Sequence, residues 1–191
     1  MATPGAPNHP IRISTQVVVV GSGAGGAAAA AALTRAGVAT VVVEMGDKEL
    51  PSTFTQREED MIPRLFQEAG ARTTLDGAIA VLQGKGVGGS TLHNLNLCKR
   101  VPASILEQWK ETQGLADLPG ELSVAYEFME AHLGVHQIPE ARMSRNNQIF
   151  RAGCEALGWK SGPLQHNRQG CVGSGFCELG CAYDAKLNAA R

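Results

Sequence analysis

The chain has 191 residues, of which 43% are hydrophobic, enough for one sizeable core or for one domain with an appendage. A net charge of −1 without any lysine or arginine run argues against a dedicated nucleic-acid surface. No stretch is apolar enough to span a bilayer, and the first residues lack the charged and apolar regions of a secretory signal. We expect a cytoplasmic protein in which residues 1–11 form a disordered tail.

Residues 16–46 have the pattern of a βαβ unit that holds an adenine dinucleotide. Four valines at 17–20 predict a buried strand, and residues 40–43 predict a second apolar strand. The intervening G-x-G-x-x-G permits a tight turn, close approach of a pyrophosphate, and packing of the next helix on the strand. The candidate cofactor-binding residues of this turn are Gly21, Ser22, Gly23, Ala24 and Gly26.

The residues beyond this turn complete the pattern. The N-terminus of the helix offers unpaired N–H groups and a positive dipole end, so that phosphates need no basic side chain there. Glu44 ends the second strand about 20 residues later, where a carboxylate accepts hydrogen bonds from ribose hydroxyls. Glu44 and the following Met45 are therefore candidate cofactor-binding residues. In the alternative interpretation, Glu44 is a solvated charge at the end of an ordinary βαβ unit.

The middle of the chain predicts one more strand and several helices. We expect a helix over residues 56–70 that is interrupted near Pro63, and a third strand over residues 78–83. Apolar residues at helical spacing then predict helices over residues 103–113, 121–133 and 145–157, the last with Ser144 as its N-cap. Phe150, Cys154 and Leu157 form one apolar stripe, and we expect Trp109 and Trp159 to pack in the core.

A second glycine cluster follows the predicted third strand, with the sequence GKGVGGSTLHN at residues 84–94. Four glycines in six residues weaken any regular element, but they allow backbone N–H groups to lie against a cofactor. Short polar side chains add donors that could reach phosphate or ribityl oxygens. A tight surface loop is the alternative. The candidate cofactor-binding residues here are Gly84, Val87, Gly88, Gly89, Ser90, Thr91, His93 and Asn94.

With both glycine clusters in place, the chain resembles the glucose-methanol-choline (GMC) oxidoreductases, a family of FAD flavoproteins that oxidise alcohols. GSGAGG with Glu44 resembles the family's ADP-binding fingerprint, and GKGVGGSTLHN resembles its second signature. The similarity extends through LEQWK, ALGW and CVGSGFCELGCAYDAK, essentially along the whole chain. It implies FAD as the cofactor, a small-molecule alcohol as the substrate, and hydride transfer from the alcohol carbon to the flavin.

The resemblance also implies an α/β fold with a Rossmann-like FAD-binding (βαβ) domain and a mostly helical extension. Residues 12–100 would form the FAD-binding core with the second flavin loop. Residues 101–191 would form a helical and Cys/Gly-rich extension that leads into a missing substrate domain. The chain ends inside a predicted helix over residues 182–191, so we interpret it as truncated before the substrate domain.

His93 departs from the second signature, which usually has an aliphatic residue at this position. Choline-oxidase-like members also have histidine followed by asparagine, and in those relatives the histidine is joined covalently to the flavin. The resemblance therefore implies that His93 could form a histidyl-FAD bond. The alternative is a histidine that stacks on the flavin or is satisfied within the protein.

Cys171, Cys177 and Cys181 fall within eleven residues, which is dense enough to suggest a metal site. Their spacing matches no common zinc finger or ferredoxin pattern, so small residues shaping a turn, or a disulfide, are the alternatives. His132, His136 and His166 have no resemblance to the family's catalytic motif, and we expect them at the surface or at helix ends. No catalytic residue is assigned, because the catalytic histidine is expected beyond Arg191.

Three functions remain open at this point. The first is the N-terminal part of an alcohol-oxidising flavoenzyme, with the missing C-terminal half supplying the chemistry. The second is a non-catalytic FAD-binding module, or one that docks on a separate subunit. The third is an electron-transfer component with metal at the cysteine cluster. A nicotinamide dehydrogenase would leave residues 84–94 without a purpose.

Overall fold

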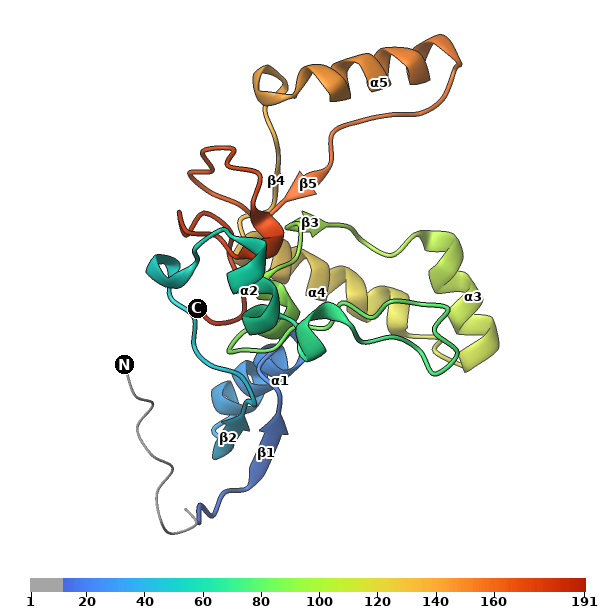
Figure 1. Ribbon diagram of the computed structural model, residues 1–191. Coiled ribbons are helices and arrows are strands. Elements are labelled where there is room, and N and C mark those ends of the chain that lie inside the picture. The colour runs from blue at the N-terminus through green and yellow to red at the C-terminus, as the bar shows by residue number, and fades with distance from the viewer. Residues whose placement is uncertain (1–11) are drawn as a thin grey trace.

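The structure is a computed structural model that describes residues 12–191 (Figure 1). The expected tail over residues 1–11 lies outside the described residues. The chain begins with β1 (Val17–Val20), α1 (Ala24–Arg35) and β2 (Thr40–Val43). The two strands are parallel, with Val17 opposite Thr40 and Val20 opposite Val43. The βαβ unit predicted from the valines and the glycine turn is therefore confirmed, with the predicted strand bounds.

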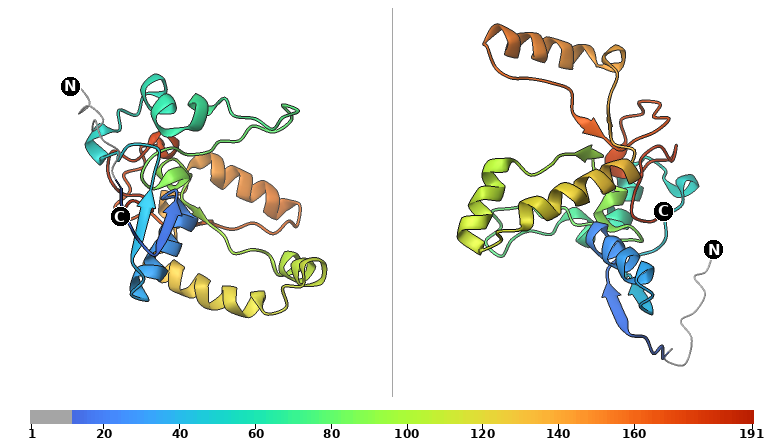
Figure 2. Two further views of the ribbon diagram at one scale, coloured as in Figure 1. Left: turned by 90° about the horizontal axis from the view of Figure 1, so that it is seen from below. Right: turned by 180° about the vertical axis from the view of Figure 1, so that it is seen from behind.

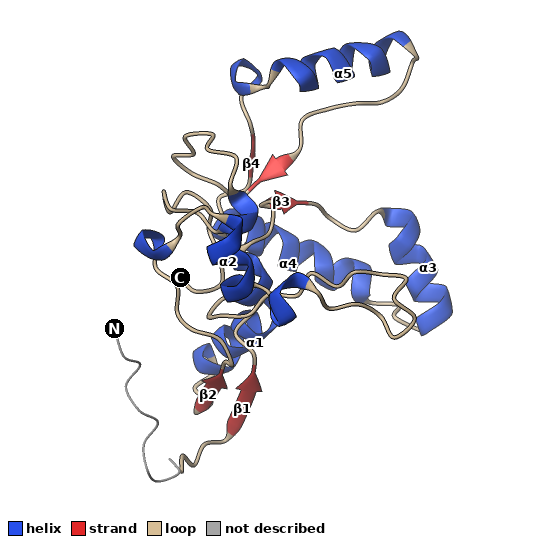
Figure 3. Ribbon diagram, viewed as in Figure 1, coloured by secondary structure: helices blue, strands red, loops and turns tan. Residues whose placement is uncertain are grey.

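The expectation that the first strand is buried is wrong. Val17 and Val19 are half-buried, but Val18 and Val20 are 55% and 84% exposed. Side chains alternate between the two faces of a strand, and α1 covers only one face of the pair. The other face, which also carries Val43 opposite Val20, has no cover among the described residues, as the lower part of Figure 3 shows.

The core lies around α2 (Glu58–Leu65), outside the βαβ unit. Met61 and Leu65 on α2 are fully buried, and they pack with residues of the short helices η3 (Gly89–Leu92) and η5 (Cys177–Leu179). The helix expected over residues 56–70 is shorter than predicted. After Leu65 the backbone becomes extended, and the next turn, η2 (Gln67–Gly70), contains two residues with positive φ.

The third predicted strand, over residues 78–83, is absent among the described residues. Ala80 forms a single bridge with Thr73, and Val81 donates its N–H to the carbonyl of Arg72. The segment is therefore one arm of a short turn, because no neighbouring strand is present to pair along its length. The only other sheet in the described region is small and antiparallel, with the order β3 (Leu97–Cys98), β5 (Gln165–His166), β4 (His136–Gln137).

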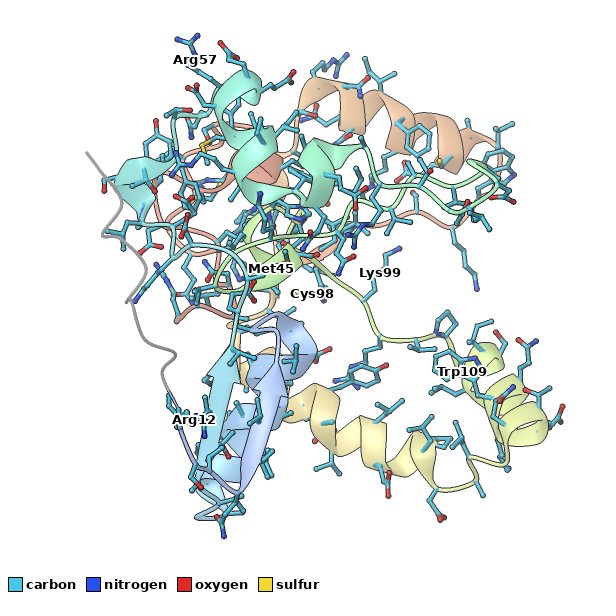
Figure 4. The ribbon with its side chains drawn as sticks, turned by 60° about the horizontal axis from the view of Figure 1, so that its bottom comes forward. Arg12, Met45, Arg57, Cys98, Lys99 and Trp109 are labelled. Carbon is cyan, nitrogen blue, oxygen red and sulfur yellow. The ribbon has the colours of Figure 1, made fainter. Side chains whose placement is uncertain are left out.

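The three later helices are confirmed as α3 (Ala103–Gln113), α4 (Leu118–His132) and α5 (Arg145–Ala156), and Ser144 caps α5 through the N–H of Asn147. Their predicted packing is only partly right. Trp109 is 38% exposed on α3 (Figure 4), and α5 projects away from the other elements (Figures 1 and 2). Cys154 is buried, but the large apolar residues on or next to α5 are exposed: Ile149, Phe150, Leu157 and Trp159.

The helix predicted over residues 182–191 is also absent. Ala185 accepts a hydrogen bond from the N–H of Gln169, and Leu187 donates its N–H to the carbonyl of Asn167. These bonds to a remote segment replace the local bonds of a helix, and Asp184 has a positive φ. The last residues therefore run as an irregular segment beside the core.

Candidate functional site

The first glycine turn, residues 21–26 (loop 1), joins β1 to α1. Gly21 has a φ of +90° and donates its N–H to the carbonyl of Val43. A Cβ at Gly26 would overlap the carbonyl oxygen of Gly21, so no larger residue fits there. Gly23 is the N-cap of α1, and no side chain of the described residues caps this helix end. The first-turn N–H groups of α1 are therefore available to an anion.

The carboxylate of Glu44 connects loop 1 to the second glycine cluster, residues 84–94 (loop 2). Its Oε2 accepts hydrogen bonds from the Ser22 N–H at 2.9 Å and from the Ser22 hydroxyl at 2.8 Å. Its Oε1 accepts from the N–H groups of Met45, Gly46 and Gly86 at 3.0–3.4 Å. The Ser22 hydroxyl also accepts from the Gly88 N–H at 3.0 Å. Glu44 and Ser22 thus hold the two loops together.

These contacts determine the charge state of Glu44. Burial by itself raises the pKa of this carboxyl, but the hydrogen bonds from Ser22, Gly46 and Gly86 together outweigh burial and lower the pKa below its ordinary value. Glu44 is therefore ionised at neutral pH. The prediction that Glu44 contacts a ribose stays a prediction, and the structure adds that the same carboxylate orders the loops.

Loop 2 lies directly against loop 1. Gly86, Gly88 and Gly89 all have positive φ, and a Cβ at Gly89 would come within 2.8 Å of the Gly23 Cα. A Cβ at Gly84 would overlap the backbone of Ser90. Glycine is required at these positions because the two backbones approach too closely for side chains. The fold therefore brings the two glycine clusters, 58 or more residues apart in the sequence, into direct backbone contact.

The polar side chains of loop 2 contact the protein itself. Ser90 Oγ accepts from the Gly84 N–H at 2.8 Å, and Thr91 Oγ1 accepts from the Ala189 N–H at 2.9 Å. The Asn94 Oδ1 accepts from the Asn96 N–H, although Asn94 is exposed. Their assignment as cofactor donors stays a prediction. The half-buried Val87 ties the loop to Asp47 through its N–H, and Met45, 73% exposed, lies at the end of β2 (Figure 4).

His93 is 6% exposed and lies on the ring of Phe66, with 4.0 Å between the ring centroids. Its Nε2 is enclosed and has no hydrogen-bond partner in the described part of the chain. Burial, followed by the positive charge of Lys186, lowers the pKa of His93, so the ring is neutral at pH 7. His93 also borders a pocket of about 490 Å³ whose wall includes Phe66, Phe176 and Leu179.

A buried polar cluster beneath loop 2 was missed from the sequence. Asn96 is 2% exposed with a φ of +55°, and its Oδ1 lies 2.8 Å from His166 Nδ1. His166, expected at the surface, is 9% exposed because β5 places it between β3 and β4. Lys186 is 2% exposed, and its ammonium donates to three backbone carbonyls. The residues around Lys186 include Tyr183, Asp184 and Asn188, so the local sequence carries no signal that this lysine is buried.

The three clustered cysteines are not arranged as a set of metal ligands in the described residues. All carry free thiols and border one pocket of about 130 Å³, but within residues 12–191 no group of three or more His, Cys, Asp or Glu side chains could hold a metal ion. Each sulfur instead accepts a hydrogen bond: Cys171 from the Gly173 N–H, Cys177 from Asn96 Nδ2 and Cys181 from the Ala185 N–H. The metal-binding hypothesis therefore has no supporting geometry.

Comparison with known proteins agrees with this geometry. A family model described as GMC oxidoreductase matches residues 62–191, and a model described as NAD(P)-binding Rossmann-like domain matches residues 19–72. Over the described residues, no helix combines the length and the apolar composition needed to cross a bilayer.

Several curated relatives align along nearly the whole chain. Long-chain-alcohol oxidase FAO3 of Arabidopsis thaliana is 36% identical over 95% of this chain and 24% of its own length. An uncharacterized GMC-type oxidoreductase of Mycobacterium tuberculosis is 36% identical over 89% of this chain and 28% of its own length. Another uncharacterized GMC-type oxidoreductase, y4nJ of Sinorhizobium fredii, is 30% identical over 96% of this chain and 36% of its own length. The chain thus spans about a quarter to a third of these relatives.

The first family match covers more than half of the chain and includes loop 2, most of the buried core residues and the buried lysine. The second covers most of the βαβ unit and Glu44. The two glycine loops that the fold brings into contact are therefore both inside matched regions. Together these findings show that the chain belongs to the GMC oxidoreductases.

Proposed function

We propose that the chain is the N-terminal FAD-binding part of an oxidoreductase that acts on CH–OH groups of alcohol donors. The observation that carries the proposal is the contact between loop 1 and loop 2, held by Ser22 and Glu44. A single Rossmann turn would suit many dinucleotides, but a second glycine loop packed on it suits a flavin dinucleotide better.

The residues present fit the adenine-dinucleotide part of FAD. The uncapped N-terminus of α1 supplies N–H groups for an anionic pyrophosphate. The close backbone approaches at Gly26 and Gly89 leave no room for side chains beside that helix end. The ionised Glu44 at the end of β2 is suited to ribose hydroxyls and repels a 2′-phosphate. Bound FAD would supply hydride acceptance, while these residues bind and orient it.

We further propose that FAD is held without a covalent bond. The Nε2 atom of His93 is enclosed, and the ring lies on Phe66, so a bond through Nε2 would require the ring to turn. Acid precipitation of the flavin-loaded protein tests this point. We expect the yellow colour in the supernatant, and colour in the pellet would show the histidyl-FAD bond instead.

The experiment for the proposed function is FAD binding by the purified chain. The protein is mixed with FAD, separated from free flavin by gel filtration, and examined for flavin absorbance at the protein peak. Gly26→Ala serves as a variant in which loop 1 cannot close, and it should elute without flavin. A wild-type peak without flavin would contradict the proposal. Anaerobic bleaching of bound flavin by an alcohol, in the longest polypeptide that contains this chain, tests the alcohol substrate.

A further inference from the structure

Lys186 is a buried cation that makes no ion pair in the described part of the chain. Its Nζ donates to the carbonyl oxygens of Leu92 at 2.8 Å, Asn94 at 2.8 Å and Cys177 at 2.9 Å. An ammonium group has three N–H donors, and all three are used. Two of the acceptors flank His93 in loop 2, and the third belongs to η5.

The same terminal segment holds loop 2 at a second point. The Ala189 N–H donates to Thr91 Oγ1 at 2.9 Å, and a Cβ at Gly88 would lie within 3.2 Å of the Ala190 N. Residues 186–190 therefore run along loop 2 from Gly88 to Asn94. Lys186 is the member of this segment that supplies both a charge and several hydrogen bonds.

Removal of the ammonium would leave three backbone carbonyls without this donor, one of them buried (Leu92) and two part-buried (Asn94 and Cys177). Such groups are costly to leave unpaired, so the turn over residues 92–94 would change shape until water or other donors reached them. His93 lies in the middle of that turn, on Phe66. The position of its ring thus depends on bonds made by a residue 93 positions away in sequence.

We propose that Lys186 is a positioning residue, whose ammonium group holds residues 92–94 in the conformation that seats the His93 ring and receives the flavin. The part of this inference that concerns flavin binding rests on the proposed function. The seating of His93 is a property of the protein alone, so the two parts can fail separately.

The protonation of Lys186 makes the idea testable in the wild-type protein. Burial lowers the pKa of Lys186 to about 8, although the thiols of Cys177 and Cys181 and the carboxylate of Glu178 act in the opposite direction. His93 is the remaining titratable group that faces it. A neutral amine has only two N–H donors, so one of the three carbonyls loses its bond above this pH.

The test compares Lys186→Met with Lys110→Met, a matched substitution on α3, where the exposed Lys110 pairs with Glu107. Two readouts are taken from each protein after far-UV circular dichroism has confirmed folding. The first is the nuclear magnetic resonance signal of the His93 imidazole as a function of pH without FAD, assigned through His93→Gln. The second is the Kd for FAD, from quenching of flavin fluorescence between pH 6.5 and about pH 9.5.

Lys186→Met should shift the His93 resonance and raise the pKa of His93, because the neighbouring positive charge is gone. It should also weaken FAD binding by roughly tenfold or more, the size expected for lost buried hydrogen bonds to a charged group. Lys110→Met should leave both unchanged. In the wild type the Kd should rise as pH passes about 8, and in Lys186→Met it should stay flat.

An unchanged His93 resonance in Lys186→Met would overturn the proposed seating of His93, and an unchanged Kd beside a shifted resonance would overturn the proposed role in receiving the flavin. A pH dependence of the Kd that persists in Lys186→Met would assign the titration to a group other than Lys186 and would also count against the proposal. If Lys186→Met does not fold, the wild-type pH profile alone tests the proposal, and a Kd for FAD that stays constant as pH passes about 8 would overturn it. Absence of FAD binding by the wild type would instead refute the proposed function, while the His93 readout would still test the seating.

Discussion

Replacement of Glu44 by glutamine should destabilise the folded chain, because this carboxylate accepts five hydrogen bonds and donates none. Oε2 accepts two bonds from Ser22, and Oε1 accepts three from backbone N–H groups. A glutamine keeps one acceptor oxygen and turns the other into an NH₂ donor. If the amide oxygen stays among the three backbone groups, the NH₂ faces the Ser22 N–H, and donor meets donor.

The size of the effect follows from that arrangement. The Ser22 N–H, in a residue that is 8% exposed, loses a hydrogen bond to a charged acceptor, which costs about 2–3 kcal/mol. The Ser22 hydroxyl can rotate and accept a hydrogen bond from the NH₂, so the free-energy cost of losing its bond to Glu44 is smaller. For a chain of this length each kcal/mol lowers Tm by about 2–4 °C, so Glu44→Gln should lower Tm by roughly 4–12 °C.

The assay is thermal unfolding followed by circular dichroism at pH 7, with Glu111→Gln as the control. Glu111 is an exposed residue of α3, so its replacement should change the free energy of unfolding by less than about 0.5 kcal/mol. If Glu44→Gln melts within about 2 °C of Glu111→Gln, the contact between the loops does not depend on this carboxylate. The reasoning about how loop 1 and loop 2 are joined would then be refuted.

Two further predictions concern the same site. Gly26→Ala should unfold at a lower temperature than the wild type, because its Cβ would overlap the Gly21 carbonyl oxygen. Gly25→Ala should unfold at the same or a higher temperature, because a Cβ at Gly25 meets nothing within 4 Å and alanine favours the helix. Equal melting of the two variants would show that loop 1 is not closely packed. Since folding depresses the pKa of Glu44, its contribution to stability is present above its ordinary value of 4.5 and is lost as pH falls through the lower folded value. The Tm difference between wild type and Glu44→Gln, measured from pH 7 down to pH 3, should therefore shrink below about pH 4.5, and a constant difference would contradict the assigned pKa direction.

The sequence by itself determined the elements whose hydrogen bonds are local. The bounds of β1 and β2, the glycine turn and the helix between them, and the helices α3 and α5 followed from apolar spacing, glycine positions and the serine cap. The family also followed from the sequence, because its two signatures are short and contiguous. In these cases the residues that determine the structure lie within a few positions of one another.

Only the tertiary structure decided the features that depend on remote partners. The segment over residues 78–83 lacks a neighbouring strand, and Ala185 and Leu187 bond to residues 167–169 instead of forming a helix. Glu44 contacts Gly86 across 42 positions, and Lys186 reaches Leu92 across 94. Periodicity carries no information about such contacts, because a buried ammonium or carboxylate is stabilised by whichever donors and acceptors the fold brings to it.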